Sequence, residues 1–212
     1  MNVSDIVAEL LVQLSLTKVH GLMGGGAAGL NDGFICNSNI DYLCYHNEQS
    51  AGYAALAEAR LKKRWAILNP TTGCGGTNAY TPVLNAWQDS IPLVVISGNV
   101  NLNTCTQYIQ DGEDFELRAY GVQENDIEKC VKPITKFTST LWAASDLEDT
   151  FLKAFSLANS GRKGPVWIDI PADIQHQQIP NTSSQFIPKL AKKILNGENR
   201  PKFKKSDQSK KG

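Results

Sequence analysis

Short apolar runs alternate with segments of helical spacing along most of this chain. Residues 5–16 carry apolar side chains at helical intervals, and Ser4 is the predicted N-cap, so a helix is expected there. Residues 91–97 form an almost continuously apolar run, as is typical of a strand buried at the centre of a parallel sheet. The pattern therefore predicts helices and strands that follow one another in turn.

The predicted elements keep this order over about 170 residues. Strands are expected at residues 19–23, 40–45, 65–68, 91–97 and 165–170. Helices are expected at residues 27–36, 48–60, 124–130 and 145–160, with a further helix that ends near residue 89. A Gly- and Thr-rich loop at residues 69–76 and a long irregular stretch at residues 99–121 separate them. Such alternation predicts an α/β fold with a doubly wound, mostly parallel sheet and helices on both faces.

Charge divides the chain into two parts. The 212 residues have 21 basic and 21 acidic side chains, so no overall positive field favours nucleic acid. Residues 181–212 hold nine basic side chains but only two acidic ones, with little apolar surface to bury. We therefore expect one domain at residues 1–178 and a basic linker or disordered tail at residues 179–212.

The cysteines and histidines do not suggest a metal site. Five cysteines show no CxxC spacing and three histidines are scattered, so no zinc site is predicted. No signal-peptide pattern is present, and no apolar run approaches the roughly 18 residues that span a bilayer. A soluble, reduced, cytoplasmic protein is expected.

Glu48 is the most informative single residue. It lies where the predicted strand 40–45 gives way to an Ala-rich helix, and α/β proteins usually build their sites at such helix entrances. A first-turn Glu that is merely stabilised by the helix dipole is the structural alternative.

Two glycine-rich segments offer further candidates. Residues 24–29 satisfy G-x-G-x-x-G, but the acidic partner of a dinucleotide site is not at the expected place. Residues 69–78 lack the Lys-Ser/Thr ending of a phosphate-binding P-loop. Cys74 in this segment has no base beside it in sequence, so a small packing residue is favoured over a nucleophile.

Seven collinear segments together resemble thiamine-diphosphate enzymes of the acetolactate synthase type. They are residues 19–26, 46–49, 71–78, 87–93, 121–127, 132–136 and 161–171. The resemblance covers about residues 1–178 and corresponds to the N-terminal pyrimidine-binding (PYR) domain, which has a flavodoxin-like fold. Cys74 and Met23 stand where relatives usually have proline, which leaves the geometry of the pocket open.

The resemblance also implies roles for individual residues. Glu48 would hydrogen-bond N1′ of the cofactor's aminopyrimidine and share a proton with it, which prepares the cofactor to attack a 2-oxo acid. Gln123 would point into the substrate cavity as a second catalytic residue. The expected cofactor-binding residues are Glu48, Gly24, Gly25, Gly73, Cys74, Gly75 and Asn78.

The family's diphosphate- and Mg²⁺-binding segment is absent, since the acidic residues 110–114 lack its spacing and are expected to be solvated surface. Three interpretations remain open. The chain is the first domain of a longer carboligase that acts on pyruvate or another 2-oxo acid, the PYR subunit of a split 2-oxo acid decarboxylase, or a non-catalytic dimerisation or binding module. A homodimer or higher oligomer, or a partner chain with the diphosphate site, is expected in the first two.

Overall fold

The computed structural model describes residues 1–111, 114, 117–179 and 185–197. Strands in these residues are β1 Lys18–Gly21, β2 Asp41–Cys44, β3 Ala66–Asn69, β4 Leu93–Asn99, β5 Phe137–Thr140 and β6 Val166–Pro171. All neighbouring strands are parallel, in the order β2-β1-β3-β4-β6-β5. The first four keep the flavodoxin-like order, and β6 lies between β4 and the edge strand β5. The predicted doubly wound α/β fold is confirmed.

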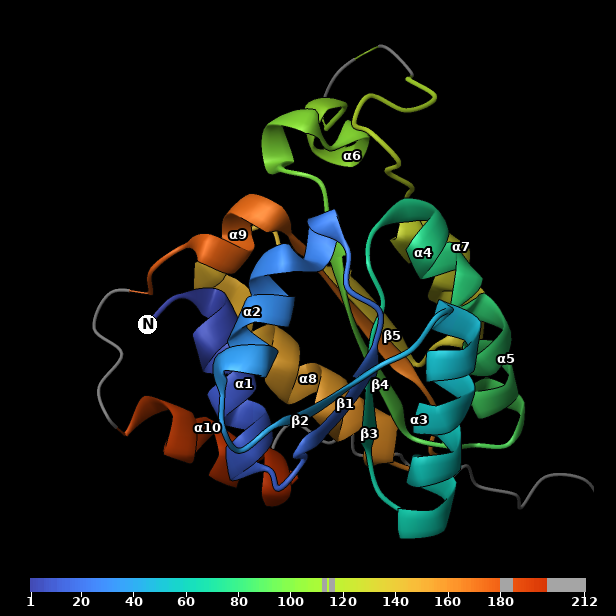
Figure 1. Ribbon diagram of the computed structural model, residues 1–212, viewed down its shortest axis with the longest axis vertical. Helices are drawn as coiled ribbons and strands as arrows, with labels where there is room; N and C mark the ends of the chain where they lie inside the picture. Colours follow the sequence, from blue (N-terminus) through green and yellow to red (C-terminus); the bar gives the residue numbers. More distant parts are fainter. Residues whose placement is uncertain (112–113, 115–116, 180–184, 198–212) are drawn as a thin grey trace, which may run out of the picture.

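Helices cover both faces of this sheet, as Figure 1 shows. On one face lie α3 Glu48–Lys62, α4 Gly73–Asn78, α5 Tyr80–Gln88 and α7 Ile127–Val131. On the other lie α1 Val3–Gln13, α2 Ala28–Cys36, α8 Leu147–Asn159, α9 Ala172–His176 and α10 Phe186–Leu195. Short 3₁₀ turns are η1 Gly25–Ala27, η2 Leu102–Thr104, η3 Lys132–Ile134 and η4 Ala144–Asp146. Among the described residues no helix is both long and apolar enough to cross a bilayer.

The core explains why the central strands are apolar without interruption. Side chains alternate between the two faces of a strand, and here both faces are covered. On β4, Val94 packs into the cluster beneath α1 and α8, whereas Val95 packs into the cluster beneath α3 and α5. Trp167, the partner of Val95 in the register of β6, lies in the same second cluster.

Helix α1 begins earlier than its apolar spacing predicts. Its N-cap is Asn2, whose side chain accepts a hydrogen bond of 2.8 Å from the N–H of Asp5, while Asp5 accepts one of 3.3 Å from Asn2 in return. This reciprocal capping box satisfies two backbone donors at once. The prediction of Ser4 as N-cap is therefore wrong. Ser4 is itself a residue of the helix, and its hydroxyl donates a hydrogen bond to the carbonyl of Gln175.

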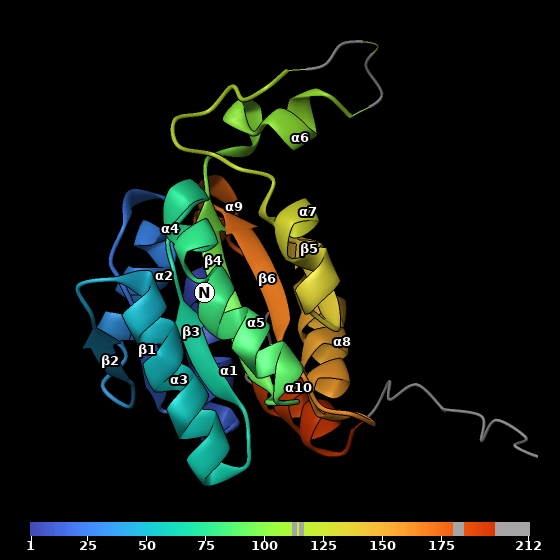
Figure 2. The ribbon, with the colours of Figure 1, turned by 90° about the vertical axis from the view of Figure 1, so that its right-hand side faces the viewer.

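Several other boundaries differ from the sequence prediction. The expected loop 69–76 becomes helical at Gly73, the helix expected at 124–130 begins only at Ile127, and β5 was not predicted. The stretch 99–121 contains η2 and a one-turn helix, α6 Thr106–Ile109, which projects beyond the carboxyl edge of the sheet (Figures 1 and 2). The β5 side chains are mostly half-buried, so this edge strand lacks the apolar run that marks the central strands.

Helix α10 lies within residues 179–212, where a linker was expected. Its buried side chains are Ile187, Leu190, Ala191 and Ile194, which share one helix face and belong to the same core cluster as α1 and α8. Lys193 also donates to Glu148 of α8 at 2.6 Å. Residues 186–195 therefore pack as part of the domain. The expectation of disorder for residues 180–184 and 198–212 falls outside the described residues.

Candidate functional site

The candidate site lies at the carboxyl edge of the sheet, between β1 and β3, where the order in which successive strands are added to the sheet reverses. Loops that follow these two strands meet there, as is usual for ligand sites in open α/β sheets. The contact between them is tight: a Cβ added to Gly24 would lie 2.3 Å from Oγ1 of Thr71. Glycine at position 24 therefore lets the two loops touch.

Glu48 begins α3 close to these loops. Asn47 caps the helix, because its side chain accepts hydrogen bonds from the N–H groups of Gln49 and Ser50 at 2.9 and 3.3 Å. Glu48 is only 8% exposed. Its Oε2 accepts a 2.7 Å hydrogen bond from the amide of Asn78, which lies 30 residues further along at the end of α4. The fold thus brings two residues of the predicted set into direct contact.

A hollow of about 460 Å³ opens beside this pair. Its lining residues are Glu48, Cys74, Gly75, Thr77 and Asn78, of which four were predicted to bind a cofactor. A Cβ on Gly75 would come within 2.8 Å of Oε1 of Glu48, so glycine keeps this oxygen accessible. Among the described residues Oε1 accepts no hydrogen bond. The arrangement presents a nearly buried carboxylate oxygen that is ready to bind a donor.

Thr71 adds a second unsatisfied group at the junction of the loops. Its Oγ1 is buried and has no hydrogen-bond partner among the described residues. The Thr71 methyl group lies near Gly75, since a Cβ there would approach it to 2.5 Å. Buried hydroxyl groups are normally paired, and an orphaned one beside an open hollow fits a site that is completed by a ligand.

The loop of residues 24–26 is held firmly by side chains that the sequence analysis did not single out. Asn31 accepts from the N–H of Gly24 at 3.2 Å and donates to Asn69 at 2.7 Å. The fully buried Gln175 donates to the carbonyl of Gly26 at 2.7 Å and accepts from the N–H of Leu30. Gly25 itself is exposed, and an added Cβ would meet nothing within 4 Å. The protein therefore presents Gly25 on an ordered loop.

Gln123 lies at the entrance of α4 rather than in the hollow beside Glu48. It has a left-handed backbone with φ of 60° and an exposed side chain. Gly73, with φ of 56°, packs directly on its backbone, because a Cβ there would lie 1.4 Å from the Gln123 carbonyl oxygen. Four predicted residues do not line the hollow beside Glu48. They are Gly24, Gly25, Gly73 and Gln123.

A buried polar network supports α4 from below. Asp169, near the end of β6, is 2% exposed and accepts hydrogen bonds from Ser97 and, at 2.7 Å, from Asn99. Asn99 in turn accepts from the hydroxyl of Thr72, the residue before α4, at 3.1 Å. Burial raises the pKa of Asp169 to about 7, although the two hydrogen bonds oppose the shift.

Asp169 should give the domain an unusual pH dependence. Its folded pKa of about 7 exceeds the ordinary value of 3.8, so the folded state binds more protons between these values. Stability should therefore fall as pH rises from about 4 to 7, by at most about 1.4 kcal/mol per pH unit. Urea denaturation across this range measures the slope. The Asp169→Asn variant should lose most of it, and an equal slope in the variant would contradict the assignment.

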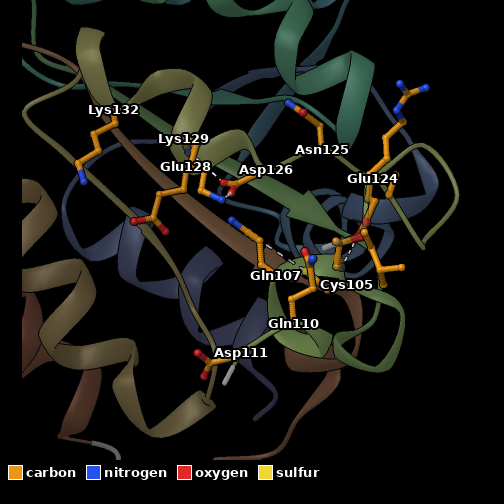
Figure 3. A pocket seen from close by; sticks show the side chains of 14 residues that line it. Cys105, Gln107, Gln110, Asp111, Glu124, Asn125, Asp126, Glu128, Lys129 and Lys132 are labelled. Atoms are coloured by element: carbon orange, nitrogen blue, oxygen red, sulfur yellow. Dashed lines mark hydrogen bonds and ion pairs between the residues drawn. The ribbon is translucent and has the colours of Figure 1, made fainter. Parts of the chain in front are cut away.

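Another hollow, of about 610 Å³, lies beneath the projecting α6 segment (Figure 3). Two of its carboxylates, those of Glu124 and Asp126, already have structural partners. Glu124 accepts from the N–H groups of Thr106 and Tyr120, and Asp126 pairs with Lys129 at 2.9 Å. Asp111, from the acidic segment 110–114, also lines it. Within the described residues no group of three or more His, Cys, Asp or Glu side chains could hold a metal ion.

Comparison with known proteins identifies the family of this chain. Residues 1–118 match the family model of the thiamine pyrophosphate enzyme N-terminal TPP binding domain. Acetolactate synthase isozyme 3 large subunit of Escherichia coli is 34% identical over 171 residues, which are 81% of this chain and 28% of that protein. The acetolactate synthase large subunit of Corynebacterium glutamicum is 31% identical over 179 residues, 84% of this chain and 27% of that protein.

A solved structure shows the same fold. The thiamine diphosphate-dependent 4-hydroxybenzoylformate decarboxylase of Rhodococcus jostii RHA1 superposes with a TM-score of 0.76 at 24% identity, over 88% of this chain and 33% of that one. The chain thus spans about a quarter to a third of the length of these relatives. It belongs to the thiamine pyrophosphate enzyme family and corresponds to the N-terminal, pyrimidine-binding domain of such enzymes.

Proposed function

We propose that this domain supplies the proton-sharing glutamate of an acetolactate synthase-like carboligase. The protein that contains it would decarboxylate pyruvate or another 2-oxo acid and transfer the remaining unit to a carbonyl acceptor. The observation that carries the proposal is Glu48, a nearly buried carboxylate with one oxygen fixed by Asn78 and the other facing an open hollow. The similarity to acetolactate synthases supports the reaction class.

The residues present fit the aminopyrimidine half of thiamine diphosphate. Oε1 of Glu48 would share a proton with N1′ of the ring, and the hydrogen bond from Asn78 would keep the carboxyl group in that position. Cys74 and Gly75 would form the backbone wall of the pocket, Gly73 would begin the helix that carries them, and the loop with Gly24 and Gly25 would lie near the reacting centre. Gln123 would contact the substrate. When bound, the cofactor supplies the electron sink for decarboxylation.

The remaining contacts must come from elsewhere. We expect Mg²⁺ and the diphosphate to be held by a domain or chain with carboxylate and amide ligands, because Mg²⁺ prefers oxygen donors and usually binds with substrate phosphates. All five cysteines are free thiols, which favours a reducing compartment such as the cytoplasm. A PYR subunit of a split 2-oxo acid decarboxylase, or a non-catalytic dimerisation module, are the alternatives. The pairing of Glu48 with Asn78 beside an open hollow favours the catalytic proposals over the last.

The isolated 212-residue chain should bind thiamine diphosphate only weakly, with a dissociation constant above about 100 μM. The pyrimidine contacts alone are present, and charge-assisted contacts to the diphosphate would be missing. Isothermal titration calorimetry with Mg²⁺ measures this. Micromolar binding by the chain alone would contradict the proposed division of the cofactor site between two domains.

We also expect the chain, or the protein that contains it, to form at least a dimer. The hollow beside Glu48 is open to solvent on one side, and a second subunit would close it and exclude water from the proton-sharing carboxyl group. Sedimentation velocity over a range of concentrations measures the assembly. A protein that stays monomeric at tens of micromolar would contradict this expectation and would also exclude a dimerisation module.

A further inference from the structure

A third hollow lies at the opposite, amino edge of the sheet. It has a volume of about 590 Å³ and is lined by Trp87, Gln88, Lys136, Arg162 and Lys163, which together we term the amino-edge groove. Each of these residues precedes a strand: Trp87 and Gln88 precede β4, Lys136 precedes β5, and the last two precede β6. The groove is therefore separate from the site at Glu48, which lies where strands end.

One wall of the groove is aromatic. Trp87, at the end of α5, is 40% exposed although tryptophan is usually largely buried. Gly164 lies beneath it, since an added Cβ would be 3.7 Å from the indole ring and 3.1 Å from the side chain of Lys136. The glycine leaves room between the indole and the lysine stem. A flat ring could stack there on Trp87.

The rest of the lining is cationic and partly fixed in place. Arg162 donates through Nε to the hydroxyl of Ser90 at 2.7 Å and through Nη2 to the carbonyl of Gln88 at 3.2 Å. Lys136 donates to the carbonyl of Ser160. These partners are neutral, so they orient both cations without cancelling either charge.

No carboxylate balances this charge within the groove. Its five lining residues include none, and Lys163 forms no ion pair or hydrogen bond among the described residues. The acidic residue next in sequence, Asp89, is already bound to Arg60 and to Asn85. Three like charges next to an apolar wall repel one another, and an anion would relieve this repulsion.

From this arrangement we propose that the amino-edge groove binds a small aromatic anion, with its ring on Trp87 and its carboxylate or phosphate among Lys136, Arg162 and Lys163. The volume of about 590 Å³ lies in the range of small-molecule sites. The two hydrogen bonds of Arg162 hold its guanidinium in place, and its remaining N–H groups on Nη1 and Nη2 suit the planar, two-oxygen geometry of such groups. The binding does not depend on the proposed thiamine-dependent reaction.

Titration of the ¹⁵N-labelled chain with four probes tests the proposal. The probes are 2-naphthoate, 2-naphthyl phosphate, the neutral 2-naphthamide and inorganic phosphate. The indole N–H signal of Trp87, assigned with a Trp87→Phe variant, should shift with at least one aromatic anion at a dissociation constant below about 1 mM. The amide and inorganic phosphate should bind at least about tenfold more weakly, because each lacks one of the two recognised features. The tighter aromatic anion identifies the preferred acidic group.

Two variants of equal charge separate the groove from a general attraction of anions. Lys163→Gln should weaken the better aromatic anion about tenfold, since it removes one charged donor. Lys192→Gln removes an exposed lysine of α10, outside the groove, and should leave the affinity unchanged. Both should keep the melting temperature of the parent chain. Three results would each overturn the proposal: equal binding of the better aromatic anion and naphthamide, equal affinity in the two variants, or no shift of Trp87 with either aromatic anion.

Discussion

The Glu48→Gln substitution is expected to slow proton exchange at the thiazolium C2 of thiamine diphosphate by about 10²–10⁴-fold. The variant would be made in the whole protein that contains this domain, loaded with cofactor and Mg²⁺. Glutamine can accept the hydrogen bond from Asn78 and can occupy the same volume. It cannot share a proton with N1′, so only the chemical step should be lost. Deuterium exchange followed by ¹H NMR measures that step without any acceptor substrate.

Two further variants make the result specific. Glu9→Gln changes a carboxylate on α1 that accepts a hydrogen bond from Gln13, far from the candidate site in sequence, and the C2 exchange rate of this variant should match that of the parent. Asn78→Ala should reduce exchange less than Glu48→Gln does, since it removes the residue that orients the carboxyl group but not the group itself. Normal exchange in Glu48→Gln would refute the proton-sharing role and, with it, the proposed function.

Alanine at Gly73 is expected to destabilise the domain by about 3 kcal/mol or more. The residue has φ of 56°, and the added Cβ would overlap the carbonyl oxygen of Gln123, 1.4 Å away. The contact involves the backbone on both sides, so neither segment can move apart without a large cost in free energy. Urea denaturation at pH 7 gives the change in the free energy of unfolding.

Gly76→Ala is a matched control in the same short helix. There the added Cβ would be 3.4 Å from its nearest neighbours, an ordinary contact, and φ is not positive. Because alanine favours helix by about 1 kcal/mol over glycine, this variant should be neutral or slightly more stable. Comparable loss of stability in both variants would show that α4 tolerates no side chain at either of these glycine positions, rather than that Gly73 is specially constrained.

Sequence patterns predicted the central parts of the fold well because burial there is two-sided. The strand that became β4 has apolar residues facing both layers, which produces an uninterrupted run. Edge strand β5 has no such run, since its side chains are mostly half-buried, and it was overlooked. Helix α4 was taken for a loop because three of its six residues are glycine, which has low helix propensity.

The composition of α10 conceals its helical pattern. Three lysines among its ten residues suggested a linker, whereas the helix period places Ile187, Leu190, Ala191 and Ile194 on one buried face. Periodicity over this segment would have found the helix. Its partners on α1 and α8 lie far away in sequence, so no local pattern could show that they need this cover.

The contact between Glu48 and Asn78 follows from the motifs that carry the family resemblance. The supporting residues Asn31, Asn69 and Gln175 were not predicted, because their hydrogen bonds join segments up to 149 residues apart. Polar residues at the last positions of otherwise apolar strands were the one usable signal. Asn69 and Asn99 both occupy such positions.

The packing of α10 on α1 also decides how this domain can be exchanged between relatives. A chimaera joined at residue 178 would lose α10 from the core cluster and would expose the apolar side of α1 to solvent. Fusion points placed beyond residue 195 retain that helix with its own domain. Swaps of whole folding units in this family should therefore carry the lysine-bearing helix along with the sheet that it covers.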